Sequence, residues 1–299
     1  MSWHSKKEHP SGCSFCSKVW YEEGNAATIM LMVFLPVFIA LAGTAFGSFV
    51  DAITWRLHTK RNFVSDRSEC EHCHHKLGPL DLIPIVSWVI LGGKCRYCKK
   101  PITALAPLTE LAMGLLFLAS YLFWPLGFES WQGITLFALW LVYLVSLGIL
   151  FVYDLRWGLL PDVIVYPLVV LGLVDAALRI SLTPGAGVTE YASHVVLGVA
   201  AMAGIYGTLY MVSRGKWVGF GDVKLAVFMG AVLGWEKTLL VLMLANVIGL
   251  LIVAPGLLSK KLTPKSHIPF GPFMIAAFVI AGLAGDVVIR WYLESFVLI

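Results

Sequence analysis

The sequence predicts an all-α polytopic membrane protein with about eight transmembrane helices and one small polar loop domain. Three observations lead to this fold class. Hydrophobic residues make up 59% of the 299 residues and charged residues only 13%, which is too little charge for a water-facing surface. The mean hydropathy is +0.82. Apolar runs recur along the chain, and about 20 such residues suffice for one helix to cross the hydrocarbon core.

Eight apolar runs have the length or the boundaries of membrane helices. They cover residues 28–50, 104–124, 132–152, 159–179, 191–213, 222–235, 237–258 and 269–289. The sixth run is short and begins at a break between glycines, which is typical of a half-length helix that lines a cavity. We expect the first run to be a retained helix, because a polar tail precedes it and a basic loop follows it.

The runs divide the chain into a polar N-terminal tail (1–27), a first transmembrane helix (28–50), a loop domain (51–103) and a transmembrane core (104–299). Lys and Arg concentrate on the cytoplasmic side of membrane proteins. The loop domain carries nine of the 22, the other loops on its side raise the number to sixteen, and the opposite side has six. We therefore expect a cytoplasmic loop domain and both termini outside. Since topology accounts for the basic residues, the expected partner is membrane lipid and not nucleic acid.

Two Cys-x-x-Cys pairs lie in the loop domain with 21 residues between them: Cys70 with Cys73, and Cys95 with Cys98. A tetrahedral zinc site takes four such thiolates, two from each pair. A reducing cytoplasm disfavours disulfides. We therefore predict one structural zinc ion per chain, which holds together a loop too short for a core of its own. Two alternatives stay open: four cysteines without a ligand, and replacement of a cysteine ligand by one of the histidines His72, His74 and His75.

A third pair, Cys13 and Cys16, lies in the N-terminal tail near His4 and His9. A disulfide, an accessory metal site and no role at all are each compatible with it. The sequence gives no reason to choose among them.

Asp154 and Asp222 lie at the cytoplasmic ends of apolar runs, each beside a break marked by glycine or proline. A carboxylate at the bilayer boundary is costly unless it is solvated, ion-paired or used in chemistry. Their shared side predicts a dyad in which one carboxylate takes a proton from water while the other donates one to a carbonyl oxygen. We expect both at the mouths of helices, where the backbone amides of a helix start favour the ionised form. Solvated or salt-bridged aspartates are the alternative.

Two other classes of protein also place acids near a membrane. In a secondary transporter, acids such as Asp175 would bind protons or cations, although the sequence has no inverted repeat. In a lipid-linked transferase, Asp154 and Asp162 would hold magnesium. Lys224 follows Asp222 by two residues, so the two do not face each other on a helix. We expect Lys224 to pair with Asp162 or to extend its ammonium group to the membrane surface.

Several short motifs occur in an order that resembles one known family. They are Gly47-Ser48-Phe49 with Arg56-Leu57; the four loop cysteines; Ile83-Pro84 with Ser87-Trp88 and Gly93-Lys94; Pro107-Leu108 with Glu110-Leu111; Asp154 with Pro161-Asp162 and Pro167; Gly219-Phe220-Gly221-Asp222-Val223-Lys224-Leu225; and Ile268-Pro269-Phe270-Gly271-Pro272. From about residue 43 to 280 the chain resembles the type IV prepilin peptidases, which are bifunctional leader peptidases and N-methyltransferases of bacteria. We interpret the last motif as the boundary before the final span, because its prolines prevent regular helix; substrate gating is the alternative.

This resemblance implies an eight-span aspartyl protease of the GxGD type in the bacterial inner membrane, with Asp154 and Asp222 as the catalytic pair. Such a protease would cut the basic leader from prepilins or pseudopilins at the cytoplasmic face, and would then methylate the new N-terminal amine with S-adenosylmethionine. The matching residues around the pair are expected to support it: Pro161, Asp162, Gly219, Gly221 and Lys224. No nucleotide-binding motif identifies residues for the methyl donor.

Four places depart from the family's pattern, all in or beside the loop domain. Asp51 stands where the family often has Asn, Glu71 where it usually has Pro, and Leu82 where Asn is common. Leu105-Ala106 replaces a common Arg-Tyr pair. The departures concern the region that the resemblance ties to methyl transfer and not the two aspartate motifs.

Overall fold

The structure, a computed structural model, describes residues 26–62, 66–182, 187–260 and 268–296. Within those residues it is helical, with two isolated β-bridges in the loop domain and no strand. Seven of the described helices are long and apolar enough to cross a membrane. The predicted all-α membrane fold is therefore confirmed. Cys13 and Cys16 lie outside the described residues.

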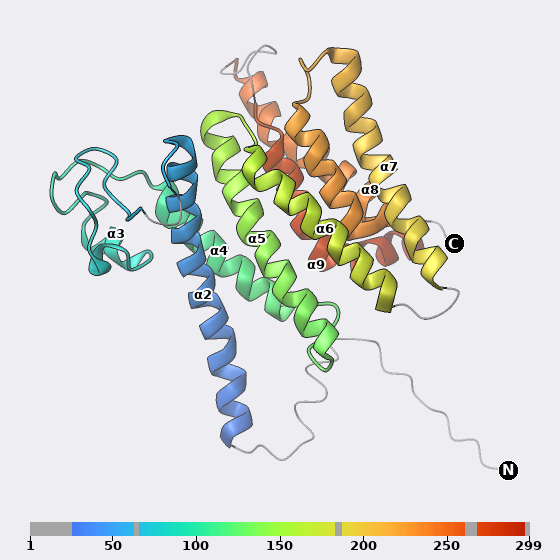
Figure 1. Cartoon of the computed structure of the whole chain (residues 1–299), viewed down its shortest axis with the longest axis horizontal. Helices are drawn as coiled ribbons and strands as arrows, with labels where there is room; N and C mark the ends of the chain where they lie inside the picture. The colour runs from blue at the N-terminus through green and yellow to red at the C-terminus, as the bar shows by residue number, and fades with distance from the viewer. Residues whose placement is uncertain (1–25, 63–65, 183–186, 261–267, 297–299) are drawn as a thin grey trace.

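The long helices are α2 (Ala26–His58), α4 (Leu105–Leu122), α5 (Trp131–Trp157), α6 (Asp162–Leu182), α7 (Gly187–Ser213), α8 (Phe220–Leu258) and α9 (Gly271–Phe296). Two short helices, η1 (Pro79–Asp81) and α3 (Val86–Ile90), lie in the loop domain. Figure 1 shows this domain beside the ends of α2 and α4, while α5 to α9 pack together on the other side of α2.

The longest helix, α8, contains a sharp reversal. Gly234 has φ 73° and ψ 176°, a non-helical conformation that is open to glycine because it lacks a Cβ atom. In the half after Gly234, Lys237 pairs with Asp286 near the end of α9, while Gly249 faces Phe273 near the start of α9. This half therefore runs antiparallel to α9.

The half of α8 before the reversal runs alongside α6 in the same direction. At its start, Gly221 packs on Leu160, just before α6; about two turns later, Phe228 packs over Gly172. The start of α9 also contacts Leu160 through Gly271. The starts of α6, α8 and α9 thus meet at one end of the bundle, and α8 passes through it twice. The interruption at Gly234 divides α8 close to residue 236, where the sequence separates two predicted spans.

α2 and α5 extend beyond their predicted spans at the end beside the loop domain. α2 continues to His58 and α5 to Trp157. The imidazole ring of His58 stacks on the indole ring of Trp157, with the ring centroids 4.0 Å apart. α5 ends where Gly158 adopts the left-handed conformation and donates its N–H to the Asp154 carbonyl at 2.8 Å. Apolar composition marks where lipid contact ends and not where the helix ends. Asp51 and Asp154 therefore lie inside helices.

Glycines bring α2 and α4 into close backbone contact. A Cβ atom added at Gly47 would lie 2.5 Å from the Cα atom of Glu110, and one added at Gly43 would lie 2.6 Å from the Met113 carbonyl oxygen. Small residues allow such close approach between membrane helices. As a result, Glu110 is pressed against α2 and is only 9% exposed.

Candidate functional site

Asp222 lies at the positive end of its own helix. It is the third residue of α8 and is 9% exposed. Its Oδ2 atom accepts a hydrogen bond from the Gly219 backbone N–H at 3.1 Å, and its own N–H donates to the Gly219 carbonyl at 3.2 Å. The helix start and this N–H stabilise a negative charge there. Asp222 thus has the helix-start environment that the sequence predicts.

Asp154 has a different environment from the one expected. It lies in the last turn of α5, whose carbonyl end opposes a negative charge, and it is 4% exposed. The expectation of a helix start is therefore wrong for its own helix, because α5 continues to the Gly158 cap. However, a Cβ atom added at Gly271 would lie 2.6 Å from its Oδ2 atom. Since Gly271 is the first residue of α9, the amide end of a neighbouring helix faces Asp154.

Both aspartates border the same small group of residues. Leu160 is the neighbour that they share. A Cβ atom added at Gly221, which precedes Asp222, would lie 2.9 Å from the Leu160 side chain. A Cβ atom added at Gly271, which contacts Asp154, would lie 3.5 Å from the same side chain. Tyr206 of α7 is a second link. It interacts electrostatically with Asp222, and its ring lies 5.8 Å from that of Phe270, next to Gly271.

The predicted supporting residues also lie at this end of the bundle. Lys224 Nζ contacts Asp162 Oδ1, which confirms the expected pair. The ammonium group also lies 4.7 Å from the Tyr166 ring centroid. Pro161 directly precedes α6, and its carbonyl accepts the N–H of Val165 at 3.1 Å. The ion pair between Lys224 and Asp162 therefore links the start of α8 to the start of α6.

Two further acids of the helices, Asp175 and Asp286, are ion-paired. Asp175 is fully buried in α6 and accepts from Arg179 Nε at 3.1 Å. Asp286 accepts from Lys237 Nζ at 2.8 Å. These contacts give each acid a structural partner, as expected for a charge within a membrane protein.

The four loop cysteines form the predicted cluster. Their sulfur atoms all lie within 4.8 Å of one another, and those of Cys70 and Cys98 are 3.8 Å apart. Zinc–sulfur bonds of about 2.3 Å in tetrahedral geometry place ligand sulfurs about 3.8 Å apart. The geometry and the donor set therefore fit a four-thiolate metal site.

The two halves of the cluster share one backbone pattern. The Cys70 N–H donates to the His75 carbonyl at 3.0 Å, and the Cys95 N–H donates to the Lys100 carbonyl at 2.9 Å. The fourth residue after each of these cysteines, His74 and Lys99, has a positive φ of 54° and 58°. Each pair thus sits on a tight turn that points both sulfurs the same way.

The two buried thiols differ in acidity. Burial dominates at Cys70 and raises its pKa to about 11. Burial also acts on Cys95, but hydrogen bonds from the backbone of Cys98 and Tyr97, with the nearby thiols, outweigh it and lower the pKa to about 7. Cys95 is therefore the first of the two to reach the thiolate form that binds metal.

The neighbouring histidines do not belong to the cluster of metal-type ligands. His74 Nδ1 lies 3.0 Å from Glu69 Oε1, and the His75 ring lies 3.7 Å from the Tyr97 ring. The structure thus brings together the cysteine-only set among the described residues.

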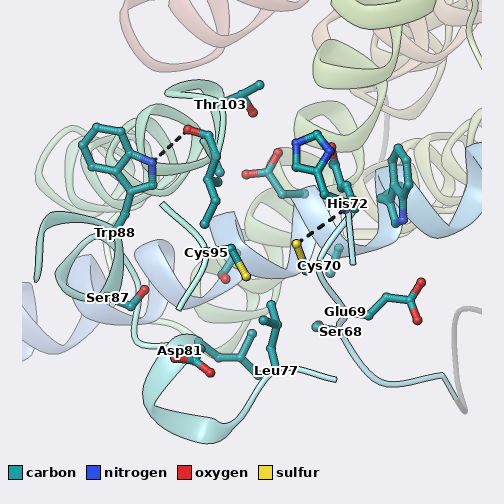
Figure 2. A pocket seen from close by; sticks show the side chains of 18 of the residues that line it. Ser68, Glu69, Cys70, His72, Leu77, Asp81, Ser87, Trp88, Cys95 and Thr103 are labelled. Atoms are coloured by element: carbon teal, nitrogen blue, oxygen red, sulfur yellow. Dashed lines mark hydrogen bonds between the residues drawn. The ribbon is translucent and has the colours of Figure 1, made fainter. Parts of the chain in front are cut away.

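A cavity of about 310 Å³ lies between the loop domain and the ends of α2, α4 and α5. Figure 2 shows Cys70 and Cys95 beside it, with Trp88 and Thr103 on one side and Asp81 and Leu77 on another. Helix residues also line it: Ser48, Asp51, Ala52, Trp55 and Arg56 of α2, Ala106, Pro107 and Glu110 of α4, and Arg156 of α5.

Sequence reasoning missed three residues beside these sites. Gly271 contacts Asp154, but its motif was interpreted through its prolines. Tyr206 is one aromatic residue within a long apolar run, and nothing in the sequence distinguishes it. Arg156 follows Asp154 by two residues and was counted only as a loop charge. Its guanidinium lies 3.7 Å from Asp51 and 3.6 Å from Glu71.

Two family models match the chain. Residues 41–124 match the bacterial peptidase A24 N-terminal domain, and residues 141–254 match the type IV leader peptidase family. The first match contains the loop domain and all the residues that line the cavity except Arg156, and the second contains both aspartates. No solved structure matches the chain.

Curated relatives agree with the family models. Proteins named prepilin leader peptidase/N-methyltransferase are similar to this chain: that of Stutzerimonas stutzeri is 34% identical over 78% of the chain and 77% of the relative, and that of Pseudomonas aeruginosa is 35% identical over the same shares. The Aeromonas hydrophila protein is 34% identical over 79% of the chain and 77% of its own length. The chain therefore belongs to the type IV leader peptidase family.

Proposed function

We propose that this protein is an aspartyl endopeptidase that removes the basic leader of type IV prepilins or pseudopilins at the cytoplasmic membrane face, and that it then methylates the new N-terminal amine. The observation that carries the proteolytic part is the arrangement of Asp154 and Asp222, two buried carboxylates that border Leu160 and the Phe270–Gly271 segment. The names of the relatives support both activities.

The different surroundings of the two carboxylates suit different roles in hydrolysis. Asp222, with the Gly219 N–H and the start of α8, is suited to remain ionised and to take a proton from the attacking water. Asp154 is suited to carry the proton that it donates to the scissile carbonyl oxygen. The hydroxyl oxygen then bonds to the carbonyl carbon, and the tetrahedral species collapses as the amide nitrogen takes a proton and leaves. The two acids titrate as a pair.

The proposed substrate is one that is already in the membrane. Its apolar helix would lie among the spans, and its polar junction would reach the dyad at the membrane surface. The basic leader would extend into the cytoplasm, on the same side as the loop domain, with both termini of the enzyme outside, as the distribution of Lys and Arg favours.

The zinc ion is proposed as a structural element, held by the thiolates of Cys70, Cys73, Cys95 and Cys98. Their sulfur separations fit this assignment. When bound, zinc would cross-link two turns of a domain whose described residues bury little apolar surface. Methyl transfer would use S-adenosylmethionine as the co-substrate.

Substitution of each aspartate tests the proposal. With Asp154→Ala or Asp222→Ala, we expect leader cleavage to fall below detection while the protein still inserts, because each acid alone lacks a partner for proton transfer. Mass measurement of a model prepilin after incubation gives the result. Asp286→Ala, which removes a paired acid at the far end of α9, is the control and should cleave. Full cleavage by either single variant would contradict the dyad.

A further inference from the structure

α7 runs antiparallel to the first half of α8, and the two helices lie side by side (Figure 1). The ring of Tyr210 lies 5.3 Å from the ring of Phe220, the first residue of α8. About three turns further along α8, a Cβ atom added at Gly198 would lie 2.7 Å from the Gly230 carbonyl oxygen. Tyr206 precedes Tyr210 by four residues, so it lies one turn away on the same face of α7. This face places Tyr206 beside the start of α8.

The Tyr206 side chain borders the surroundings of both aspartates. It is only 3% exposed, and it is near enough to Asp222 for an electrostatic interaction. Its ring lies 5.8 Å from the ring of Phe270. The next residue, Gly271, contacts the Oδ2 atom of Asp154. Tyr206 therefore forms part of the wall around the proposed catalytic pair.

The Tyr206 hydroxyl is buried but has no hydrogen-bond partner among the described residues. Buried polar groups in native proteins are normally hydrogen-bonded. Tyr143 of α5 shows the usual arrangement, because it is 1% exposed and its hydroxyl donates to the Leu171 carbonyl at 3.3 Å. The core thus provides an acceptor for one tyrosine hydroxyl and leaves the other available to a ligand beside Asp222.

A water molecule matches the chemistry of these two groups. Polar groups that lie close together without direct contact are often bridged by water, and a buried water needs several polar partners. A carboxylate accepts hydrogen bonds, and a tyrosine hydroxyl can both accept and donate. Asp222 and Tyr206 can therefore each accept one hydrogen of the same water molecule. The hydrolysis proposed above requires a water molecule beside Asp222.

We propose that Tyr206 is a further catalytic residue, which holds the nucleophilic water together with Asp222. The inference rests on the proposed peptidase function and adds a residue to its site. The water donates one hydrogen to the Asp222 carboxylate and the other to the Tyr206 hydroxyl oxygen, so that a lone pair faces the scissile carbonyl carbon. As the oxygen–carbon bond forms, the first hydrogen passes to Asp222 as a proton, and the carbonyl oxygen takes the proton of Asp154. Tyr206 neither gains nor loses a proton.

Single-turnover cleavage of a model prepilin by the purified full-length protein tests this role. Tyr206→Phe removes the hydroxyl and keeps the ring beside Phe270. With saturating enzyme, we expect cleavage about 10- to 100-fold slower than in wild type, because a poorly oriented water reacts slowly. KM should stay within about twofold of wild type, because the hydroxyl acts on the water and not on the bound peptide. Tyr143→Phe removes a buried hydroxyl outside the site and should cleave at the wild-type rate.

Thermal unfolding of the same samples separates this role from a structural one. The Tyr206 hydroxyl has no protein partner to lose, so Tyr206→Phe should unfold at the wild-type temperature or above it. Tyr143→Phe loses a hydrogen bond and should unfold at a lower temperature. The two variants should therefore differ in opposite ways: one loses activity and keeps stability, and the other loses stability and keeps activity.

A wild-type single-turnover rate for Tyr206→Phe would overturn the inference. So would a raised KM with an unchanged rate at saturation, because the hydroxyl would then bind substrate and not water. Asp222→Ala distinguishes this inference from the proposed function. If Asp222→Ala is inactive and Tyr206→Phe cleaves normally, only the role of Tyr206 fails. If Asp222→Ala still cleaves, the proposed dyad fails and the role of Tyr206 fails with it.

Discussion

The helical core and the loop domain meet at one end of the bundle, yet they are held together by different forces. In the core, aromatic rings stack between helices: Trp140 of α5 lies 5.5 Å from Phe278 of α9, which in turn lies 5.2 Å from Phe228 of α8. Within residues 66–104, by contrast, the buried residues are two of the cluster cysteines, Cys70 and Cys95, and Gly93. Ion pairs such as Arg61 with Glu69, 2.6 Å apart, lie around them.

This difference separates the two proposed activities physically. The peptidase groups lie on helices whose packing does not depend on a metal, because α5, α6, α8 and α9 position them. The proposed methyl transfer concerns the loop domain instead, and the cavity of about 310 Å³ beneath that domain has one wall of helix and one wall of loop, which includes Cys70 and Cys95. Damage to the loop should therefore affect methylation more than cleavage, and damage to the helix starts should do the reverse.

Metal removal should give the largest effect. Cys70→Ser, or a strong chelator, removes a cross-link whose apparent binding free energy in small zinc domains is about 10 kcal/mol or more. We expect residues 66–104 to lose hydrogen-exchange protection, while α5 to α9 keep their protection. His74→Ala leaves the four sulfurs intact and should retain about one zinc per chain by elemental analysis. Loss of protection throughout the core would show that the two regions are not separate.

A methyl group at Gly271 should give the next largest effect, in the opposite region. Gly271→Ala puts a Cβ atom 2.6 Å from the Asp154 Oδ2 atom, so the carboxylate must move. A displacement of about 1 Å can cost on the order of 100-fold in rate. Leader cleavage should fall by that order, with zinc content and methylation of a processed substrate unchanged. Gly204→Ala is the matched control, because nothing lies within 4 Å of its added Cβ atom; equal loss in both variants would refute a specific contact.

Arg156 links the two regions, and its loss should give an intermediate effect. Arg156→Ala leaves Asp51 and Glu71 without their shared cation, so the loop should dock less firmly on the helices. We expect faster hydrogen exchange around Cys70 and less methylation of a processed substrate, with little change in zinc content. Arg290→Ala removes a cation from the far part of α9 and should leave the loop unchanged. An effect on cleavage larger than on methylation would place Arg156 with the peptidase groups instead.

Local patterns predicted the parts of this protein that depend on local chemistry. Two Cys-x-x-Cys pairs are enough to specify a four-sulfur cluster. The apolar runs 222–235 and 237–258 were separated from the sequence close to the interruption of α8 at Gly234. The Lys224–Asp162 pair followed from helix spacing and charge. In each case the type and the spacing of the residues were enough to predict how they are arranged.

What the sequence could not predict depends on how distant segments pack. The environment of Asp154 comes from Gly271, more than a hundred residues later, and α5 extends past the apolar run that marks it. The cavity has walls from three helices and the loop, so no single segment contains its pattern. The positive φ of Ile85 could likewise not be predicted from the sequence, because isoleucine rarely adopts this conformation.

The smallest expected effect concerns the surface of the loop domain. Arg96 Nε lies 2.6 Å from Asp81 Oδ1, and this guanidinium keeps the pKa of Asp81 below its ordinary value. The pair therefore stabilises the loop above the ordinary aspartate pKa and loses this contribution as the pH falls through the lowered one. Arg96→Ala should slightly speed hydrogen exchange near η1 at neutral pH, because an exposed ion pair contributes little. The difference from wild type should shrink on acidification; a difference that grows would mean that Arg96 stabilises the loop through packing and not through charge.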